Sequence, residues 1–129
     1  MSTHHVFCYG SLMYPQVWQR VVDGRYERQH ATVRGYQRYA LRHASYPGLR
    51  PALGAAVAGV LYLDVGARDL HQLDAFEGEE YERIAVARDG ATYTASAYLY
   101  RDAFAHRVLE TVWDAAFFEA YHLPRFLTR

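Results

Sequence analysis

The stretch Val6-Phe7-Cys8-Tyr9-Gly10-Ser11-Leu12 gives the clearest indication of how this chain folds and where it binds a ligand. Its apolar part is predicted to be a strand, His5–Tyr9, which stops at a glycine, and Pro15 stands at the start of a predicted helix, Pro15–Val22. A strand, a tight turn and a helix in this order direct backbone N–H groups towards one point, where an anion such as a carboxylate can bind. The same pattern also occurs in plain connections.

Length and composition are those of a globular domain. With 129 residues, 51% hydrophobic content and 14 basic against 14 acidic side chains, the chain is expected to form one domain, residues 1–129, around one core. The absence of a basic stripe argues against a nucleic-acid partner, and no apolar run is long enough for a membrane span. The single cysteine, Cys8, excludes an internal disulfide, and the N-terminus lacks a signal-peptide pattern. These features predict a cytoplasmic protein.

Hydrophobic periodicity and turn residues predict helices interspersed among a larger number of strands. After the first strand and helix we expect, in this order, strand Ala31–Leu41, loop His43–Pro51 with a Pro-Gly turn in Tyr46-Pro47-Gly48-Leu49, strand Val57–Asp64, helix Asp69–Glu77 ended by Gly78, hairpin strands Glu82–Arg88 and Ala91–Tyr100 around Asp89-Gly90, and helix Phe104–Tyr121 broken at Leu123-Pro124-Arg125. The predicted fold class is α+β, a small closed or nearly closed mixed β-barrel with flanking helices.

Glu77 stands where an apolar side chain is expected. It follows Leu70 by seven residues and Leu73 by four, so the three side chains share one stripe of the predicted helix. Burial, and a place in the last helical turn, both raise the pKa of a carboxyl group, which then exchanges protons near neutral pH as a general acid or base must. The alternative is that the helix ends one residue early and Glu77 turns outward to pair with Arg83 or another cation.

Other catalytic arrangements have little support in the sequence. Ser11 lacks the second glycine of a nucleophile elbow and is better placed to cap the following helix than to contact a ligand. The seven histidines show no metal-binding spacing, so neither a metal nor a cofactor is expected. Cys8 lies within the apolar strand, where burial raises the thiol pKa and suppresses its nucleophilicity.

Three stretches together resemble the gamma-glutamylcyclotransferase superfamily, in its AIG2-like branch. They are Tyr9-Gly10-Ser11-Leu12, Tyr46-Pro47-Gly48-Leu49 and Leu73-Asp74-Ala75-Phe76-Glu77-Gly78-Glu79-Glu80-Tyr81-Glu82-Arg83, and their order and spacing match those of the family over most of the chain. The resemblance implies a small β-barrel with flanking helices. It also implies a cofactor-independent enzyme that cyclises a γ-glutamyl amide to 5-oxoproline and releases an amine.

The resemblance also assigns roles to residues. Glu77 matches the position of the family's catalytic acid/base, the residue that the helical stripe singles out independently. The backbone N–H groups of the turn, at Gly10, Ser11 and Leu12, are implied to hold either the α-carboxylate or the developing oxyanion of the substrate. Together with Tyr9 and Tyr98, the latter preferred over Tyr100 as a phenol in the pocket, these residues form the expected substrate site.

One departure from the family pattern concerns the leaving amine. Relatives that act on free γ-glutamyl amino acids commonly carry Asn where Leu12 stands, so the amine portion of the substrate is expected to differ. Tyr81 and Arg83 are candidates for bracing the segment around Glu77. The alternatives are a non-catalytic module that binds a small carboxylate, and a different lyase that uses the same glutamate. The expected partner is a small-molecule γ-glutamyl substrate, and both monomer and homodimer remain open.

Overall fold

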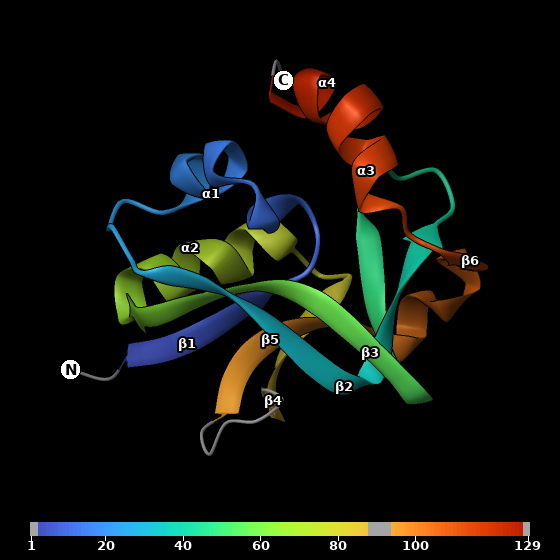
Figure 1. Cartoon of the computed structure of the whole chain (residues 1–129), viewed down its shortest axis with the longest axis horizontal. Coiled ribbons are helices and arrows are strands. Elements are labelled where there is room, and N and C mark those ends of the chain that lie inside the picture. Colours follow the sequence, from blue (N-terminus) through green and yellow to red (C-terminus); the bar gives the residue numbers. More distant parts are fainter. Residues whose placement is uncertain (1–2, 88–93, 128–129) are drawn as a thin grey trace.

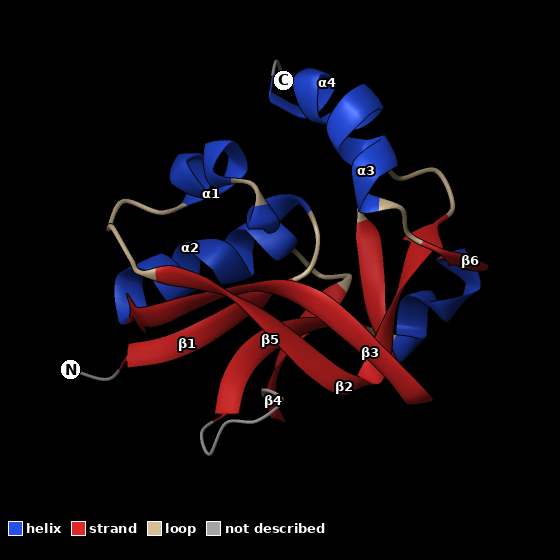
Figure 2. Ribbon diagram, viewed as in Figure 1, coloured by secondary structure: helices blue, strands red, loops and turns tan. Residues whose placement is uncertain are grey.

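Six strands form one mixed sheet, which confirms the predicted α+β class (Figures 1 and 2). The computed structural model describes residues 3–87 and 94–127. In the order β4-β5-β1-β3-β2-β6, the strands are β4 Tyr81–Ala87, β5 Thr94–Tyr100, β1 Thr3–Cys8, β3 Pro47–Gly66, β2 Arg28–Leu41 and β6 Val108–Val112. Strand β5 runs parallel to β1 and β3, and the other pairs are antiparallel.

The sheet curls into a half-barrel because its central strand is short. At Val6, β1 lies between β3, through Tyr62, and β5, through Ser96. β1 ends at Cys8, and the long strand β3 then pairs directly with β5, at Leu49 and Leu99. The chain therefore leaves β1 at the place where the two neighbouring strands close on each other, and this place becomes the site described below.

Two helices pack side by side on one face of the sheet, α1 Pro15–Val21 and α2 Ala67–Glu77 (Figure 1). The core continues on both faces of β1, because alternate side chains of a strand point in opposite directions. Val6 and Cys8 belong to the cluster beneath the helices, whereas Phe7 and Tyr9 belong to the cluster inside the curl. The first strand thus anchors both halves of the core, so its end is held rigidly.

The predicted loop His43–Pro51 is wrong. Strand β3 already begins at Pro47, and the connection from β2 is confined to residues 42–46. Gly48 is an extended strand residue rather than a turn residue with positive φ. An added Cβ there would lie 2.9 Å from Cγ of Tyr100, so the glycine is explained by the close packing of an aromatic ring rather than by a turn.

The predicted helix Phe104–Tyr121 is also wrong in its first half. Residues Asp102–Arg107 form a 3₁₀ helix, and β6 then pairs with the edge of β2, where Tyr39 lies opposite Val112. The spacing of Val108 and Val112 fits both a helix and one face of a strand, and the open edge of β2 decides between them. Tertiary pairing therefore overrides the local pattern.

The C-terminal helical segment is not broken at Pro124. The segment consists of α3 Ala115–Phe117, a π-helical turn Phe118–His122 and α4 Leu123–Leu127, without interruption. The N–H of Leu123 donates to the Phe118 carbonyl, a bond one residue longer than in an α-helix. Such a wide turn relieves the contact between a proline ring and the preceding turn, so the helix continues through it.

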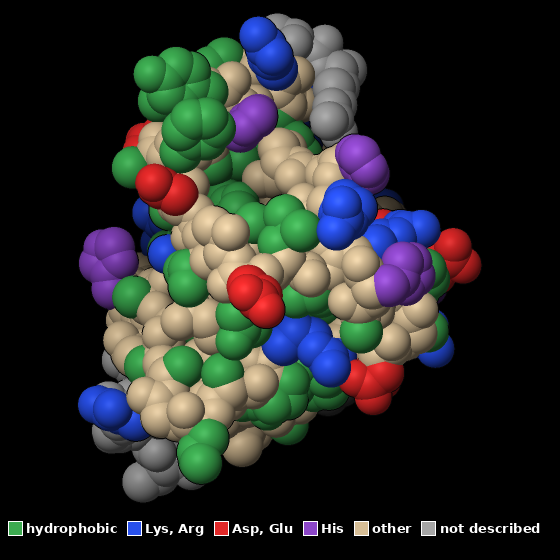
Figure 3. Space-filling model, turned by 90° about the vertical axis from the view of Figure 1, so that its right-hand side faces the viewer, with side chains coloured by type: hydrophobic (Ala, Val, Ile, Leu, Met, Phe, Trp, Pro, Cys, Tyr) green, Lys and Arg blue, Asp and Glu red, His purple; other side chains and the backbone are tan. Residues whose placement is uncertain are grey.

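The two strands predicted as a hairpin do pair. β4 and β5 are antiparallel, in register from Tyr81 opposite Tyr100 to Ala87 opposite Thr94, whereas the predicted Asp89-Gly90 turn lies outside the described residues. On the face seen in Figure 3, acidic, basic and histidine side chains are interspersed with hydrophobic ones. Within residues 3–87 and 94–127, no helix has the length and apolar content that a membrane crossing requires.

Candidate active site

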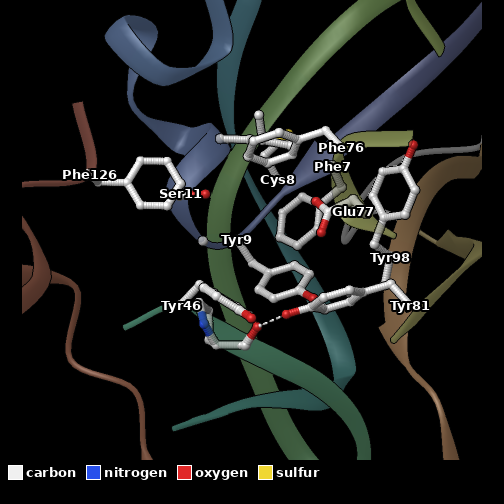
Figure 4. A pocket seen from close by; sticks show the side chains of 13 residues that line it. Phe7, Cys8, Tyr9, Ser11, Tyr46, Phe76, Glu77, Tyr81, Tyr98 and Phe126 are labelled. Atoms are coloured by element: carbon white, nitrogen blue, oxygen red, sulfur yellow. Dashed lines mark hydrogen bonds between the residues drawn. The ribbon is translucent and has the colours of Figure 1, made fainter. Parts of the chain in front are cut away.

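A cavity of about 190 Å³ lies at the end of β1, beside the closure between β3 and β5. All six residues predicted as a site line it, although they come from three separate elements of the fold (Figure 4). They are Tyr9, Gly10, Ser11 and Leu12 after β1, Glu77 at the end of α2, and Tyr98 on β5.

The turn after β1 forms one wall of the cavity. Gly10 packs so closely on Pro47 that an added Cβ would lie 2.9 Å from Cδ of the proline ring. A 3₁₀ turn, Ser11–Met13, follows, and in it the N–H of Met13 donates to the Gly10 carbonyl at 3.0 Å. Within the described part of the chain, no acceptor is found for the N–H groups of Gly10, Ser11 and Leu12. These donors are therefore available to an anionic group of a ligand.

The prediction that Ser11 caps the following helix is wrong. The N-cap position of α1 belongs to Tyr14, and no side chain caps the helix there. Pro15 at the first helical position instead sets the helical φ angle and has no N–H that needs a partner. Ser11 is buried and lines the cavity, which leaves its hydroxyl at the ligand side of the turn.

Glu77 extends into the middle of the cavity from the last residue of α2 (Figure 4). The stripe predicted from the sequence is present, because Leu70 and Leu73 are both buried on the inner face of the helix. Gly78 follows with φ of 76° and ends the helix at that point, since this backbone conformation favours glycine. The helix end therefore delivers a carboxyl group into an aromatic pocket.

Burial raises the pKa of Glu77 to about 8, and the negative charge of Asp74, one helical turn earlier, adds to the rise. The outward arrangement is wrong, because Nε of Arg83 pairs with Oδ1 of Asp74 at 3.0 Å instead of reaching Glu77. No group in the described part of the chain donates a hydrogen bond to the Glu77 carboxylate. A carboxyl group in this setting exchanges protons near neutral pH and is free to bind a ligand.

The two predicted tyrosines present their rings to the cavity, while their hydroxyl groups bond to the protein. The Tyr9 hydroxyl donates to the Tyr98 carbonyl at 2.6 Å and so ties the end of β1 to β5. The Tyr98 hydroxyl donates to Oδ1 of Asp74 at 2.7 Å. Burial raises the pKa of both phenols well above the ordinary value, which keeps them neutral. Tyr100 instead bonds Glu80, outside the cavity lining.

Several lining residues were not identified as ligand contacts from the sequence. The Tyr81 hydroxyl donates to the Pro47 carbonyl at 2.7 Å, directly beneath Glu77 in Figure 4. Tyr81 belongs to the family-like motif Leu73–Arg83, and this was the sequence feature that could have identified it as a lining residue. Phe76 and Phe126 also line the cavity. Phe126 lies on the C-terminal helix, and local sequence gave no sign that this helix would reach the site.

The lining of the cavity contains very few acidic or basic side chains. Among the described residues that line the cavity, Glu77 is the single acidic side chain, and none is Lys, Arg or His. In the same part of the chain, no three His, Cys, Asp or Glu side chains come together in a way that could hold a metal ion. The arrangement offers one proton-exchanging carboxyl group, a set of backbone donors and aromatic walls.

Comparisons with known proteins identify the family of the chain. The family model described as gamma-glutamyl cyclotransferase, AIG2-like, matches residues 6–115, a range that includes the turn and Glu77. AIG2-like protein A of Arabidopsis thaliana is 38% identical over 86 residues, which make up 67% of this chain and 52% of that protein. The chain thus spans about half the length of the curated relatives that it matches.

Solved structures share the fold. The solution structure of an Arabidopsis thaliana protein superposes with a TM-score of 0.77 at 26% identity, over 99% of this chain and 79% of that one. A structure described as a gamma-glutamyl cyclotransferase gives a TM-score of 0.64 at 16% identity, over 78% of this chain and 68% of that one, a likeness of fold alone. From the family match and the AIG2-like relative, this chain belongs to the AIG2-like gamma-glutamyl cyclotransferase family.

Proposed function

We propose that the chain is a gamma-glutamylcyclotransferase that converts a γ-glutamyl amide to 5-oxoproline and a free amine, with Glu77 as the general acid and base. Family membership supports the reaction class. The observation that carries the proposal is the Glu77 carboxyl group, which has a pKa of about 8 and extends into the cavity opposite the donors of the Tyr9–Leu12 turn. No cofactor takes part in the reaction.

The substrate supplies the nucleophile of this reaction, so the protein must mainly supply a group that carries protons. The α-amine of the substrate attacks the γ-carbonyl carbon, a C–N bond closes the five-membered ring, and the original amide C–N bond breaks. At neutral pH the α-amine is an ammonium group, so it must lose a proton before it attacks, and the leaving nitrogen must gain one. Glu77, in its ionised form, takes the first proton and gives it to the leaving nitrogen. The ring nitrogen loses a second proton as the lactam forms, and this proton ends on the released amine, which leaves as an ammonium ion. General acid–base catalysis of this kind contributes about 10²- to 10⁴-fold in rate.

The surroundings of Glu77 suit an amine donor. The Tyr81 hydroxyl hydrogen is committed to the Pro47 carbonyl, which leaves its oxygen lone pairs to accept from an ammonium group. On the turn, the N–H groups of Gly10, Ser11 and Leu12 supply donors for the α-carboxylate or for the oxyanion that develops on the γ-carbonyl. The turn lies on one side of the substrate and Glu77 with Tyr81 on the other. Enclosure between them holds the flexible glutamyl chain in a ring-closing shape, which lowers the entropic part of the barrier.

Release of 5-oxoproline from a panel of γ-glutamyl amides tests the proposal. The wild-type protein is expected to release it, and Glu77→Gln, which keeps the size but not the proton exchange, is expected to lose about 10²-fold or more in kcat. Glu79→Gln is the matched control, because Glu79 is an exposed neighbour that does not line the cavity, and it is expected to keep wild-type turnover.

Two outcomes would contradict the proposal. If Glu77→Gln keeps full turnover, another group carries the proton. If 5-oxoproline or glutamate raises the melting temperature but no γ-glutamyl compound is turned over, the chain is a carboxylate-binding module rather than an enzyme.

A further inference from the structure

We infer that Phe76 and Phe126 form a subsite for the leaving amine and select γ-glutamyl amides whose amine portion is an apolar or aromatic group without a charge. This inference rests on the proposed function, because it identifies the second half of the substrate of the same cavity. It is carried by the position of the two rings at the mouth, by the charges of the lining and by the way the C-terminal helix holds Phe126.

The two rings lie at the opening of the cavity. Phe76 lines the cavity and yet 41% of its surface is exposed, which places it at the mouth rather than the floor. Phe126 approaches from the opposite side on α4, next to the turn residue Ser11 (Figure 4). Below Glu77 in Figure 4 lie the rings of Tyr9 and Tyr81, whose hydroxyl groups donate to the carbonyls of Tyr98 and Pro47. The glutamyl end therefore lies beside Glu77 and the Tyr81 hydroxyl oxygen, and the amine portion extends between the two phenylalanine rings.

The charges of the lining oppose a charged amine portion. Glu77 is the single acidic side chain among the described lining residues, and none of them is a Lys, Arg or His that could pair with a carboxylate. A γ-glutamyl amino acid would bring a second carboxylate near Glu77 into an apolar environment, where an unpaired charge is strongly disfavoured. A neutral apolar group instead buries its surface against the aromatic rings.

The C-terminal helix holds Phe126 firmly in this position. Its ring packs edge-to-face on Phe118, with 6.0 Å between the ring centroids, and Phe118 is fully buried. The buried side chain of Leu123, at the start of α4, fixes the same segment against the core. The π-helical turn Phe118–His122 shifts the register of the helix by one residue before α4, so it decides which side chain faces the cavity. Phe126 is thus positioned by packing before any ligand binds.

Three probes that differ only in the amine portion test the inference: γ-glutamyl benzylamide, γ-glutamyl methylamide and γ-glutamylglycine. The wild-type protein is expected to turn over the benzylamide with a kcat/KM at least about tenfold above that of the other two, the range that apolar contacts give in enzyme pockets. Phe126→Ala and Phe76→Ala are each expected to reduce the benzylamide-to-methylamide ratio by about tenfold. A ratio is used because partial loss of folded protein affects both substrates equally.

The matched control is Phe117→Ala, which removes an exposed ring, 51% accessible, from the same helix without touching the cavity. It is expected to keep the wild-type ratio. If Phe126→Ala does not fold, the exposed position of Phe76 provides the same measurement. Equal kcat/KM for the three probes, or a ratio that both variants leave unchanged, would overturn the inference while the proposed function stands. Failure of the wild type to release 5-oxoproline from any probe would overturn the proposed function, and the inference with it.

Discussion

The Tyr98 hydroxyl donates a hydrogen bond to Oδ1 of Asp74 at 2.7 Å, and this contact connects β5 to the last turn of α2, the turn that carries Glu77. Arg83 on β4 bonds the same oxygen from another direction at 3.0 Å. Two strands therefore fix the helix end, and the charge of Asp74 stays close to the carboxyl group whose pKa it helps to raise. The contact positions Glu77 and tunes its protonation at the same time.

Asp74→Asn is expected to lower the pKa of Glu77, because it removes a negative charge that raises this pKa while the amide oxygen still accepts from Tyr98. If Glu77 acts as the base, kcat/KM rises with pH as its carboxyl group ionises, so the rising limb shifts to lower pH in the variant. The measurement is a kcat/KM profile for 5-oxoproline release between pH 5.5 and 9. An unshifted limb in a folded variant would contradict this electrostatic role, and Glu79→Gln serves as a control that should not move it.

Tyr98→Phe is expected to destabilise the protein and to reduce turnover only partly. The variant leaves Asp74 without one hydrogen bond, which costs about 1.5–3 kcal/mol when the acceptor is charged, whereas the aromatic wall of the cavity remains. Denaturant unfolding measures the stability, and steady-state kinetics the activity. Loss of all turnover, with unchanged stability, would instead mean that the phenol takes part directly in the reaction.

Glu77→Gln is expected to stabilise the fold above pH 5, increasingly up to pH 8. The folded protein holds the proton of Glu77 up to a pKa of about 8, and the unfolded chain releases it near 4.5, the ordinary pKa of a solvated glutamate. Between these values the folded state binds more protons, so wild-type stability falls as pH rises, on the order of a few kcal/mol in total. Glutamine does not titrate and escapes this loss. The melting temperatures of both proteins at pH 5, 6.5 and 8 check it, and a difference that stays constant with pH would refute the raised pKa.

Gly10→Ala is expected to raise KM and to lower stability by about 1–3 kcal/mol, because its Cβ would lie 2.9 Å from Pro47 and push the turn out of place. Gly66→Ala is the matched control. A Cβ at Gly66 meets its nearest neighbour, the Tyr26 hydroxyl, at an ordinary 3.6 Å. The comparison requires substrate kinetics and thermal unfolding of both variants. Equal behaviour of the two would mean that close packing of the turn on Pro47 has no role in binding.

The parts of the fold that local patterns specify were predictable from the sequence. The Gly-containing end of β1 and the apolar stripe that ends at Glu77 and Gly78 are each set within about ten residues, and both lie at the cavity. Edge pairing was not predictable in the same way, because Val108 and Val112 fit a helix or a strand until the open edge of β2 is known. The same holds for Phe126, whose role depends on packing across the fold.

The hydrogen-bond partners of the side chains in the pocket were not predictable from the sequence either. The sequence pointed to Tyr98 as a phenol in the site, and its ring is there, but its hydroxyl group bonds to Asp74. Residue spacing predicts which face of a strand a side chain occupies, whereas the partner of its polar atom depends on a neighbouring helix. Tyr81 was noted as a possible brace, but that its hydroxyl bonds the Pro47 carbonyl, on a strand assigned to a loop, could not be anticipated.

The protonation of Glu77 in the folded, ligand-free protein tests the central claim most directly. With glutamate labelled by ¹³C at the side-chain carboxyl, a titration followed by NMR between pH 4 and 9, with Glu77→Gln to assign the signal, gives the pKa of this one group. The expected midpoint is about 8. A midpoint near 4.5, the ordinary pKa of a solvated glutamate, would contradict the claim, since the carboxyl group would then sit in a water-like environment and could not serve as the buried proton carrier of the cavity.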